Sequence, residues 1–243
     1  MKTVRNLWLL LSALVIAGNV CGADARLRLL LLSGENNHDW RQTTPRLKSI
    51  LTASGRFEVD VTENPAECDA QKLAHYDVLL SNWNTFGTTN APKWPVTTRS
   101  ALLEFVRGGK GFVVVHAGGC SFYDWPEYQQ LVGASWKIGQ TSHGIPHEFT
   151  VKPVGEHPIT RGMKPFKTTD ELWVKPGVGS LSRTLALGDD QPVAFTLDFG
   201  QGRGFTLLLG HSANFMNSPG FQALLLRGTE WAATGKVTLP APN

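Results

Sequence analysis

Four histidines and one glutamate are the residues of this 243-residue chain best suited to do chemistry. His38 lies in the segment GENNHDW, His116 in VVVHAGG and His211 in LGHSANF. His143 belongs to GQTSHGIPHEF, and Glu171 belongs to DELWV. Imidazole transfers protons near neutral pH and is also the commonest metal ligand among side chains. The residue types therefore predict either an acid–base site or a metal site.

The two alternatives use nearly the same residues. In the metal alternative, His116, His143 and His211 are the ligands of a divalent metal such as zinc, because three nitrogen ligands and an open position suit that ion. Glu171 is then a fourth ligand or a base. In the metal-free alternative, His116 and His211 act as base and acid, with His38 and Glu171 beside them. The sequence leaves both alternatives open.

The elements that must position these residues alternate along the chain. Apolar runs predict strands at 26–33, 57–61, 76–83 and 111–118, and amphipathic patterns predict helices at 43–54 and 96–107. This alternation predicts an α/β fold with a mostly parallel sheet and helices on both faces. Short strands separated by turns follow between residues 147 and 210, with DELWV at 170–174 as one of them, and predict added antiparallel strands. A last helix is predicted over 220–235.

The histidines follow predicted strands, where an open parallel sheet binds its ligands. His38 follows the first predicted strand, His116 the fourth, and His211 the last long one. We therefore expect these three side chains to line one crevice. For GENNHDW a plainer interpretation stays open, in which its Asn and Asp side chains only cap the next helix and hold a loop.

Tryptophans and polar side chains in the same loops suit a sugar. Flat rings bury the apolar face of a pyranose while polar neighbours bind its hydroxyl groups. Because tryptophans also fill cores, we expect one or two of the three candidate rings at the site. The predicted substrate-binding residues are Asn37, Trp40, Asn82, Trp83, Asp124 and Trp125.

The net charge and the glycine spacing do not support binding of nucleic acid, of an anionic membrane or of a nucleotide cofactor. The formal net charge is +3 with no basic cluster, so neither nucleic acid nor an anionic membrane surface is an expected partner. The segment GGKG precedes a predicted strand and lacks the spacing of a dinucleotide fingerprint, so no nucleotide cofactor is expected.

Residues 1–23 are predicted to be a secretory signal peptide. Lys2 and Arg5 precede the apolar stretch LWLLLSALVIAG, and the small-residue exit CGA follows. The stretch is too short to cross a bilayer comfortably, and no later segment is long and apolar enough. We expect a periplasmic or secreted product that consists of one domain, residues 24–243.

Two cysteines remain in that domain, Cys68 and Cys120. They could pair in an oxidising compartment, but two cysteines do not establish a disulfide. Cys120 as a nucleophile would need a lowered pKa and access to substrate. A structural role is the simpler interpretation.

Several ordered motifs resemble those of the trehalose-utilisation, or ThuA-like, family. They are LSGENNHDWRQTTPRLKSIL, FVRGGKGFVVVHAG, FYDWPEYQQLVG, EHPITRGM, DELWV and LGHSANF. The resemblance extends from about residue 27 to residue 234. It implies a flavodoxin-like sheet related to that of the class I glutamine amidotransferases.

The same resemblance argues against amidotransferase chemistry. Those enzymes place a cysteine nucleophile on a sharp turn after a strand, and a later strand brings a histidine with a glutamate two residues on. Here His116 stands where the cysteine would be, His211 is retained, and Ala213 replaces the glutamate. A thiol mechanism needs a thiolate beside an oriented base, so it is not expected.

The resemblance implies a role in carbohydrate catabolism, on trehalose-type disaccharides or on 3-keto derivatives made by an oxidoreductase partner. A 3-keto group acidifies neighbouring C–H bonds, so a histidine base could start isomerisation or elimination, and hydrolysis could follow. The expected function is that of a secreted enzyme. The alternative is a non-catalytic carbohydrate-binding protein that uses the same crevice.

Overall fold

The computed structural model describes residues 26–87 and 94–242, so the predicted signal peptide lies outside the described residues. One half of the central sheet is parallel, with neighbouring strands in the order listed here: β2 (Phe57–Thr62), β1 (Leu27–Leu32), β3 (Val78–Ser81), β4 (Gly111–Val115) and β13 (Gly202–Leu207). Almost every residue of β1, β3 and β4 is buried, which is typical of strands covered on both faces.

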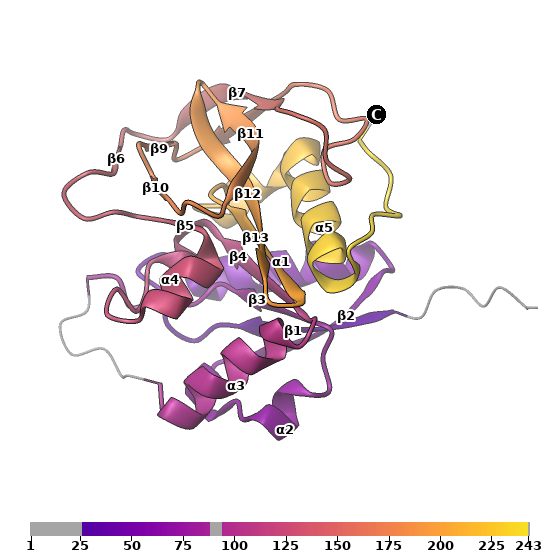
Figure 1. Ribbon diagram of the computed structural model, residues 1–243. Coiled ribbons are helices and arrows are strands. Elements are labelled where there is room, and N and C mark those ends of the chain that lie inside the picture. The colour runs from indigo at the N-terminus through magenta and orange to yellow at the C-terminus, as the bar shows by residue number, and fades with distance from the viewer. Residues whose placement is uncertain (1–25, 88–93, 243) are drawn as a thin grey trace, which may run out of the picture.

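The other half of the nine-stranded sheet is antiparallel and continues from β13 (Figure 1). Its strands, again in spatial order, are β12 (Gln191–Phe199), β11 (Arg183–Gly188), β7 (His147–Pro153) and β8 (Phe166–Asp170). Two short ribbons lie beside it: β5 (Ala134–Ser135) with β10 (Gly177–Val178), and β6 (Ser142–His143) with β9 (Trp173–Val174). The predicted parallel sheet with added antiparallel strands is confirmed.

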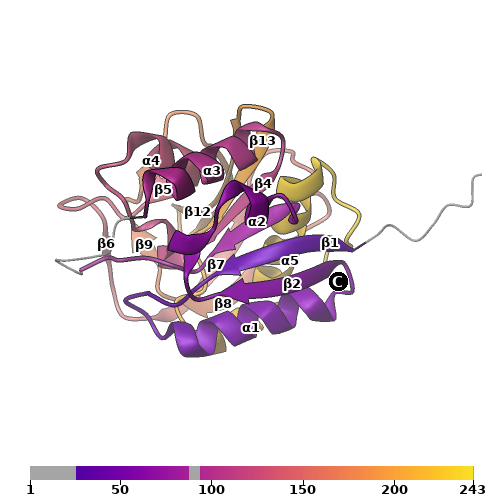
Figure 2. The same ribbon diagram turned by 90° about the horizontal axis from the view of Figure 1, so that it is seen from below.

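Helices cover both faces of the sheet. One face carries α1 (Trp40–Ala53) and α5 (Pro219–Thr234), and the other carries α2 (Ala70–Leu73), α3 (Val96–Arg107) and α4 (Pro126–Val132). Figure 2 shows α1 and α3 on opposite sides of β1. Alternation along β1 explains this, because Leu29 packs on the first face and Leu30 on the second. None of the helices in the described residues is long and apolar enough to span a bilayer.

The strand order places the functional loops. The sequence β2-β1-β3-β4-β13 is the flavodoxin-like order, in which the direction of winding reverses between β1 and β3. The loops that follow β1, β3, β4 and β13 therefore leave the sheet at one edge, and ligands bind in the crevice there.

Two of the predicted strands differ from the structure at the positions that carry Glu171 and His116. DELWV is not one strand: β8 ends at Asp170 and β9 begins at Trp173, which leaves Glu171 in the bend between them. The strand predicted over 111–118 ends at Val115, because His116 begins a 3-10 turn with a backbone φ of 47°. This left-handed conformation is uncommon outside glycine and asparagine, and it turns the chain sharply after β4.

The motif EHPITRGM is held in place by a buried arginine of α5. Arg227 donates hydrogen bonds to the carbonyl oxygens of Pro158, Ile159, Arg161 and Leu239, over distances of 2.6–2.9 Å. One guanidinium thus satisfies four carbonyl groups that would otherwise need water. The motif therefore has a structural explanation.

Arg227→Leu is expected to lower the free energy of unfolding by about 3–5 kcal/mol, because it leaves several carbonyl groups without a donor. Urea unfolding measures the change. The control is Arg161→Leu, which removes an exposed arginine of the same loop and should cost less than about 0.5 kcal/mol. Equal stabilities of the two variants would contradict the assigned role of Arg227.

Candidate functional site

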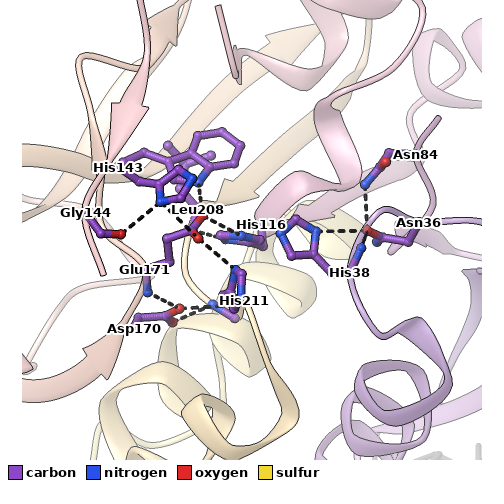
Figure 3. Close-up of polar contacts among 12 residues, drawn as sticks. Asn36, His38, Asn84, His116, His143, Gly144, Asp170, Glu171, Leu208 and His211 are labelled. Carbon is purple, nitrogen blue, oxygen red and sulfur yellow. Dashed lines mark hydrogen bonds and ion pairs between the residues drawn. The ribbon is translucent and has the colours of Figure 1, made fainter. Parts of the chain in front are cut away.

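Three histidine rings pack against one another at the carboxyl edge of the sheet (Figure 3). The ring centroid of His38 lies 4.8 Å from that of His116 and 4.6 Å from that of His211, and the last two are 5.2 Å apart. Glu171 joins them, so that one potential ligand atom of each residue lies within 4.8 Å of the others. We call these four residues the His–Glu group. It contains the three histidines that the sequence predicts in one crevice.

Asp170 connects two members of the His–Glu group that come from different parts of the sheet. Its Oδ1 accepts the backbone N–H groups of Glu171 at 2.8 Å and of His211 at 3.1 Å, and its Oδ2 accepts that of Gly210 at 2.6 Å. Burial raises the pKa of Asp170 to about 6, although these three N–H groups act in the opposite direction. Because β8 is the far edge strand of the sheet, these bonds fix Glu171 relative to the loop after β13.

Two of the rings have a defined tautomer. His116 Nδ1 lies 2.8 Å from the carbonyl oxygen of Leu208, which can only accept, so Nδ1 carries the hydrogen. His38 Nδ1 lies 3.1 Å from Oδ1 of Asn36, an oxygen that also accepts from Asn84 Nδ2 at 2.8 Å. Both rings therefore keep Nε2 unprotonated. An Nδ1–H donated to an oxygen is the usual support of a histidine that binds metal through Nε2.

Glu171 is surrounded by nitrogen atoms. Its Oε2 lies 3.2 Å from His143 Nδ1 and 3.3 Å from His211 Nδ1. Its Oε1 accepts a hydrogen bond from Trp173 Nε1 at 3.3 Å and lies 3.7 Å from His116 Nε2. The carboxylate is the only acidic member of the His–Glu group and its electrostatic centre.

Burial and this carboxylate set the charge of the site. Burial, followed by the charge of neighbouring His38, lowers the pKa of His116 to about 3. Burial, followed by the charge of His211, lowers the pKa of His38 to about 4. Burial alone would raise the pKa of Glu171, but His211, His116 and His143 together lower it to about 2. The interaction with Glu171 raises the pKa of His211. At neutral pH, two neutral imidazoles thus face a carboxylate.

Two buried nitrogens of the His–Glu group lack a hydrogen-bond partner, Nε2 of His116 and Nδ1 of His211. The 3.3 Å approach of His211 Nδ1 to Glu171 is electrostatic, because it does not satisfy hydrogen-bond geometry. Buried polar atoms without partners are rare and call for an explanation such as an ion. Three imidazole nitrogens and one carboxylate oxygen suit a divalent transition metal. The residues present therefore fit such an ion.

The structure groups a different set of potential ligands from the set predicted for a metal. His116 and His211 belong to the His–Glu group, whereas His143 does not. His143 contacts the far oxygen of Glu171, and its Nδ1 also lies 2.9 Å from the carbonyl oxygen of Gly144. His38 takes its place in the group. The sequence could not distinguish the two, because both lie in polar loops.

A pocket with a cavity volume of about 100 Å³ opens beside the His–Glu group. It includes the predicted site residues His38, His143, Glu171 and Asn37. Three aromatic side chains that the sequence did not single out also line it. The full lining is Asn37, His38, Phe86, Cys120, Trp136, His143, Glu171 and Trp173.

The predicted sugar-binding tryptophans lie elsewhere. Trp83 is 3% exposed and stacks on Phe122, and Trp125 is 6% exposed and stacks on Tyr128, so both are core residues. Trp40 lines a separate groove at the start of α1, with the guanidinium of Arg41 4.3 Å from its ring centre. None of the three lines the pocket beside the His–Glu group.

Two of the predicted polar substrate-binding residues also lie outside the pocket. Asn82 is buried, and its Nδ2 donates to the hydroxyl groups of Thr43 and Thr44, which fixes α1 against β3. Asp124 is exposed in the turn before α4 and is not part of the pocket lining. Among the polar substrate-binding candidates, the structure brings only Asn37 to the pocket.

The two cysteines within residues 26–87 and 94–242 are free thiols. Cys68 and Cys120 are both buried, in different clusters of the core. Burial raises the pKa of Cys120 to about 12, although hydrogen bonds oppose the shift. A thiolate nucleophile needs a lowered pKa. The raised pKa of Cys120 therefore favours a structural role, although the residue lines the pocket.

Asp170→Asn is expected to weaken the apparent affinity for Zn²⁺ about 10- to 100-fold, because an amide cannot accept all three N–H groups and the loops that carry Glu171 and His211 lose their common support. A competition titration with a chromophoric chelator measures the change. The control is Asp189→Asn, an exposed residue with φ of 40° that asparagine also tolerates. Unchanged affinity in Asp170→Asn would show that the support is not needed.

Comparisons with known proteins agree with this architecture. Residues 28–232 match the ThuA family, described as trehalose utilisation. No curated protein sequence matches the chain. The structure of a ThuA-like protein from Parabacteroides merdae is similar with a TM-score of 0.78 and 30% identity, over 90% of this chain and 94% of that one.

Two more distant structures share the fold. A ThuA-like protein from Bacteroides uniformis is 18% identical with a TM-score of 0.62, over 89% of this chain and 95% of that one. A β-galactosidase from Rahnella sp. R3 is 15% identical with a TM-score of 0.58, over 90% of this chain but 33% of the enzyme. Since the family match includes every member of the His–Glu group and nearly all of the described residues, this chain belongs to the ThuA family.

Proposed function

We propose that this chain is a divalent-metal-dependent enzyme of carbohydrate catabolism, acting on trehalose-type disaccharides or on their 3-keto derivatives. The observation that carries the proposal is the His–Glu group, with two buried nitrogens that lack partners and a pocket beside it. Membership of a family described as trehalose utilisation supports the choice of sugars.

The His–Glu group itself would hold the cation. A divalent cation, when bound there, supplies Lewis-acid polarisation of a substrate oxygen. Neutral imidazoles suit the ligand role, and the low pKa values of His38 and His116 keep these rings neutral. The same low values make these two rings weak bases, because an efficient base has a pKa near the working pH.

His143 is the residue placed to move a proton. Its Nδ1 faces the carbonyl oxygen of Gly144, so Nδ1 carries the hydrogen and Nε2 is free to accept one. In the proposed reaction, Nε2 takes the proton from the carbon next to the 3-keto group, and the electron pair of that C–H bond forms an enolate. Glu171, 3.2 Å from Nδ1, stabilises the imidazolium as the carboxylate of a triad does.

The fate of the enolate decides the reaction class. Transfer of the hydroxyl proton of the deprotonated carbon to the enolate oxygen, with return of the abstracted proton to the former carbonyl carbon, gives the isomeric ketone. Departure of a substituent from the next carbon with its bonding electron pair, which then takes up the abstracted proton, gives elimination. The proposal has two further parts. Residues 1–23 act as a signal peptide that directs export of the protein, and a separate sugar oxidoreductase makes the 3-keto group of the substrate.

The test combines metal analysis with product analysis. The purified protein is expected to contain about one divalent metal ion per chain and to convert 3-keto-trehalose to a product of changed mass or retention time. Chelation should abolish conversion, and the restored ion should recover it. Full turnover by a metal-free protein would eliminate the metal part. Sugar-induced thermal stabilisation without any conversion would identify the non-catalytic carbohydrate-binding alternative instead.

A further inference from the structure

The pocket beside the His–Glu group has an apolar side built from touching rings. The ring of Trp136 lies 6.0 Å from that of Phe86 and 5.4 Å from that of Trp173, measured between centroids. Trp173 and Cys120 are almost completely buried, whereas Phe86 and Trp136 are only partly buried. The first two therefore form the floor, and the last two are available to a ligand.

The rest of the lining is polar. Asn37, His38 and Glu171 supply amide, imidazole and carboxylate groups. His143 connects the two sides, since its ring lies 5.6 Å from Trp136 and its Nδ1 lies 3.2 Å from Glu171. A ligand in this pocket meets aromatic carbon on one side and hydrogen-bonding groups on the other.

We propose that Phe86 and Trp136 form the surface on which one sugar ring of the substrate packs, with its oxygen atoms directed toward His38 and Glu171. This inference rests on the proposed function for its substrate class. A pyranose ring has an apolar C–H face and a polar rim, which matches the two sides of the pocket. A wholly apolar ligand would cover His38 and Glu171 without offering either of them a new hydrogen bond in place of water.

The size of the pocket limits what enters. Its cavity volume of about 100 Å³ lies below the range of about 300–1,000 Å³ for small-molecule pockets. The pocket therefore receives at most part of one sugar ring, and the rest of a disaccharide lies outside it. Phe86 and Trp136 take the role that the sequence assigned to other tryptophans.

The test is a calorimetric titration that measures the binding of sugars to the metal-free protein. The sugars are trehalose, methyl α-glucoside and acyclic sorbitol. Both ring sugars are expected to bind with similar affinity, and sorbitol is not. Trp136→Ala should weaken binding about tenfold, the value of a lost stacking contact. Trp136→Phe should recover most of it. The matched control, Trp40→Ala, removes a tryptophan of a different groove and should bind like the parent.

Two outcomes would overturn the inference: equal binding by Trp136→Ala and the parent, or no binding of ring sugars by the parent. If Trp136→Ala does not melt cooperatively, Phe86→Ala replaces it, because that variant keeps the contact between Trp136 and Trp173. Binding needs neither metal nor turnover. If the protein binds the ring sugars but not sorbitol, and converts none of them or 3-keto-trehalose, the proposed catalysis is refuted. The inference that Phe86 and Trp136 bind a sugar ring is then still supported.

Discussion

Glu171→Gln is expected to remove the bound metal ion and to lower the turnover of 3-keto-trehalose more than about 100-fold, since loss of an outer-shell partner alone typically costs 10- to 100-fold. Glutamine keeps the shape of the side chain but not its charge. Its amide N–H₂ group would face the nitrogens of His143 and His211, which already approach Oε2. The variant also leaves three imidazoles without an anionic partner in the His–Glu group.

The experiment compares metal content and kcat of Glu171→Gln with those of the parent. Glu148→Gln is the matched control, because Glu148 is an exposed carboxylate of β7 that pairs with Lys167 at 2.7 Å, outside the pocket lining. Circular dichroism and a cooperative melt establish that both variants fold. A Glu171→Gln protein that keeps one metal ion per chain and full activity would show that the carboxylate is not a ligand.

The meeting of the three histidines could be predicted because parallel strands share an edge. His38, His116 and His211 each follow a strand of the parallel half, and the carboxyl ends of those strands lie together whatever the details of the loops. The strand and helix patterns that place them depend on local sequence, which periodicity reports directly.

The aromatic residues could not be chosen in the same way. Successive side chains of a strand point to opposite faces, and this holds for the two residues after β3. Asn82 turns toward Thr43 and Thr44 of α1, whereas Trp83 turns to the other face and stacks on Phe122. A loop assigned to the site therefore still sends some of its side chains into the core.

The role of Asp170 depends on long-range topology. It lies on β8, four strands away from β13 in the sheet, yet its carboxylate binds the N–H groups of Gly210 and His211. The spacing of residues in the sequence does not show that the end of β8 lies beside the loop after β13. Glu171 could be named as a candidate ligand or base from its residue type, but its support could not.

His143→Ala is expected to lower kcat about 10²- to 10⁴-fold, the usual contribution of a general acid or base, without loss of metal. His143 lies outside the His–Glu group, and its side chain is 43% exposed, as suits a residue that exchanges protons with substrate and solvent. The measurements are kcat, its pH profile and metal content. His147→Ala is the matched control, because His147 is another exposed histidine of the same segment, whose Nδ1 lies 3.1 Å from the carbonyl oxygen of Ile145.

Loss of metal from His143→Ala would restore the ligand set predicted from the sequence, in which His143 joins His116 and His211. Unchanged kcat and metal content would remove His143 from the site altogether.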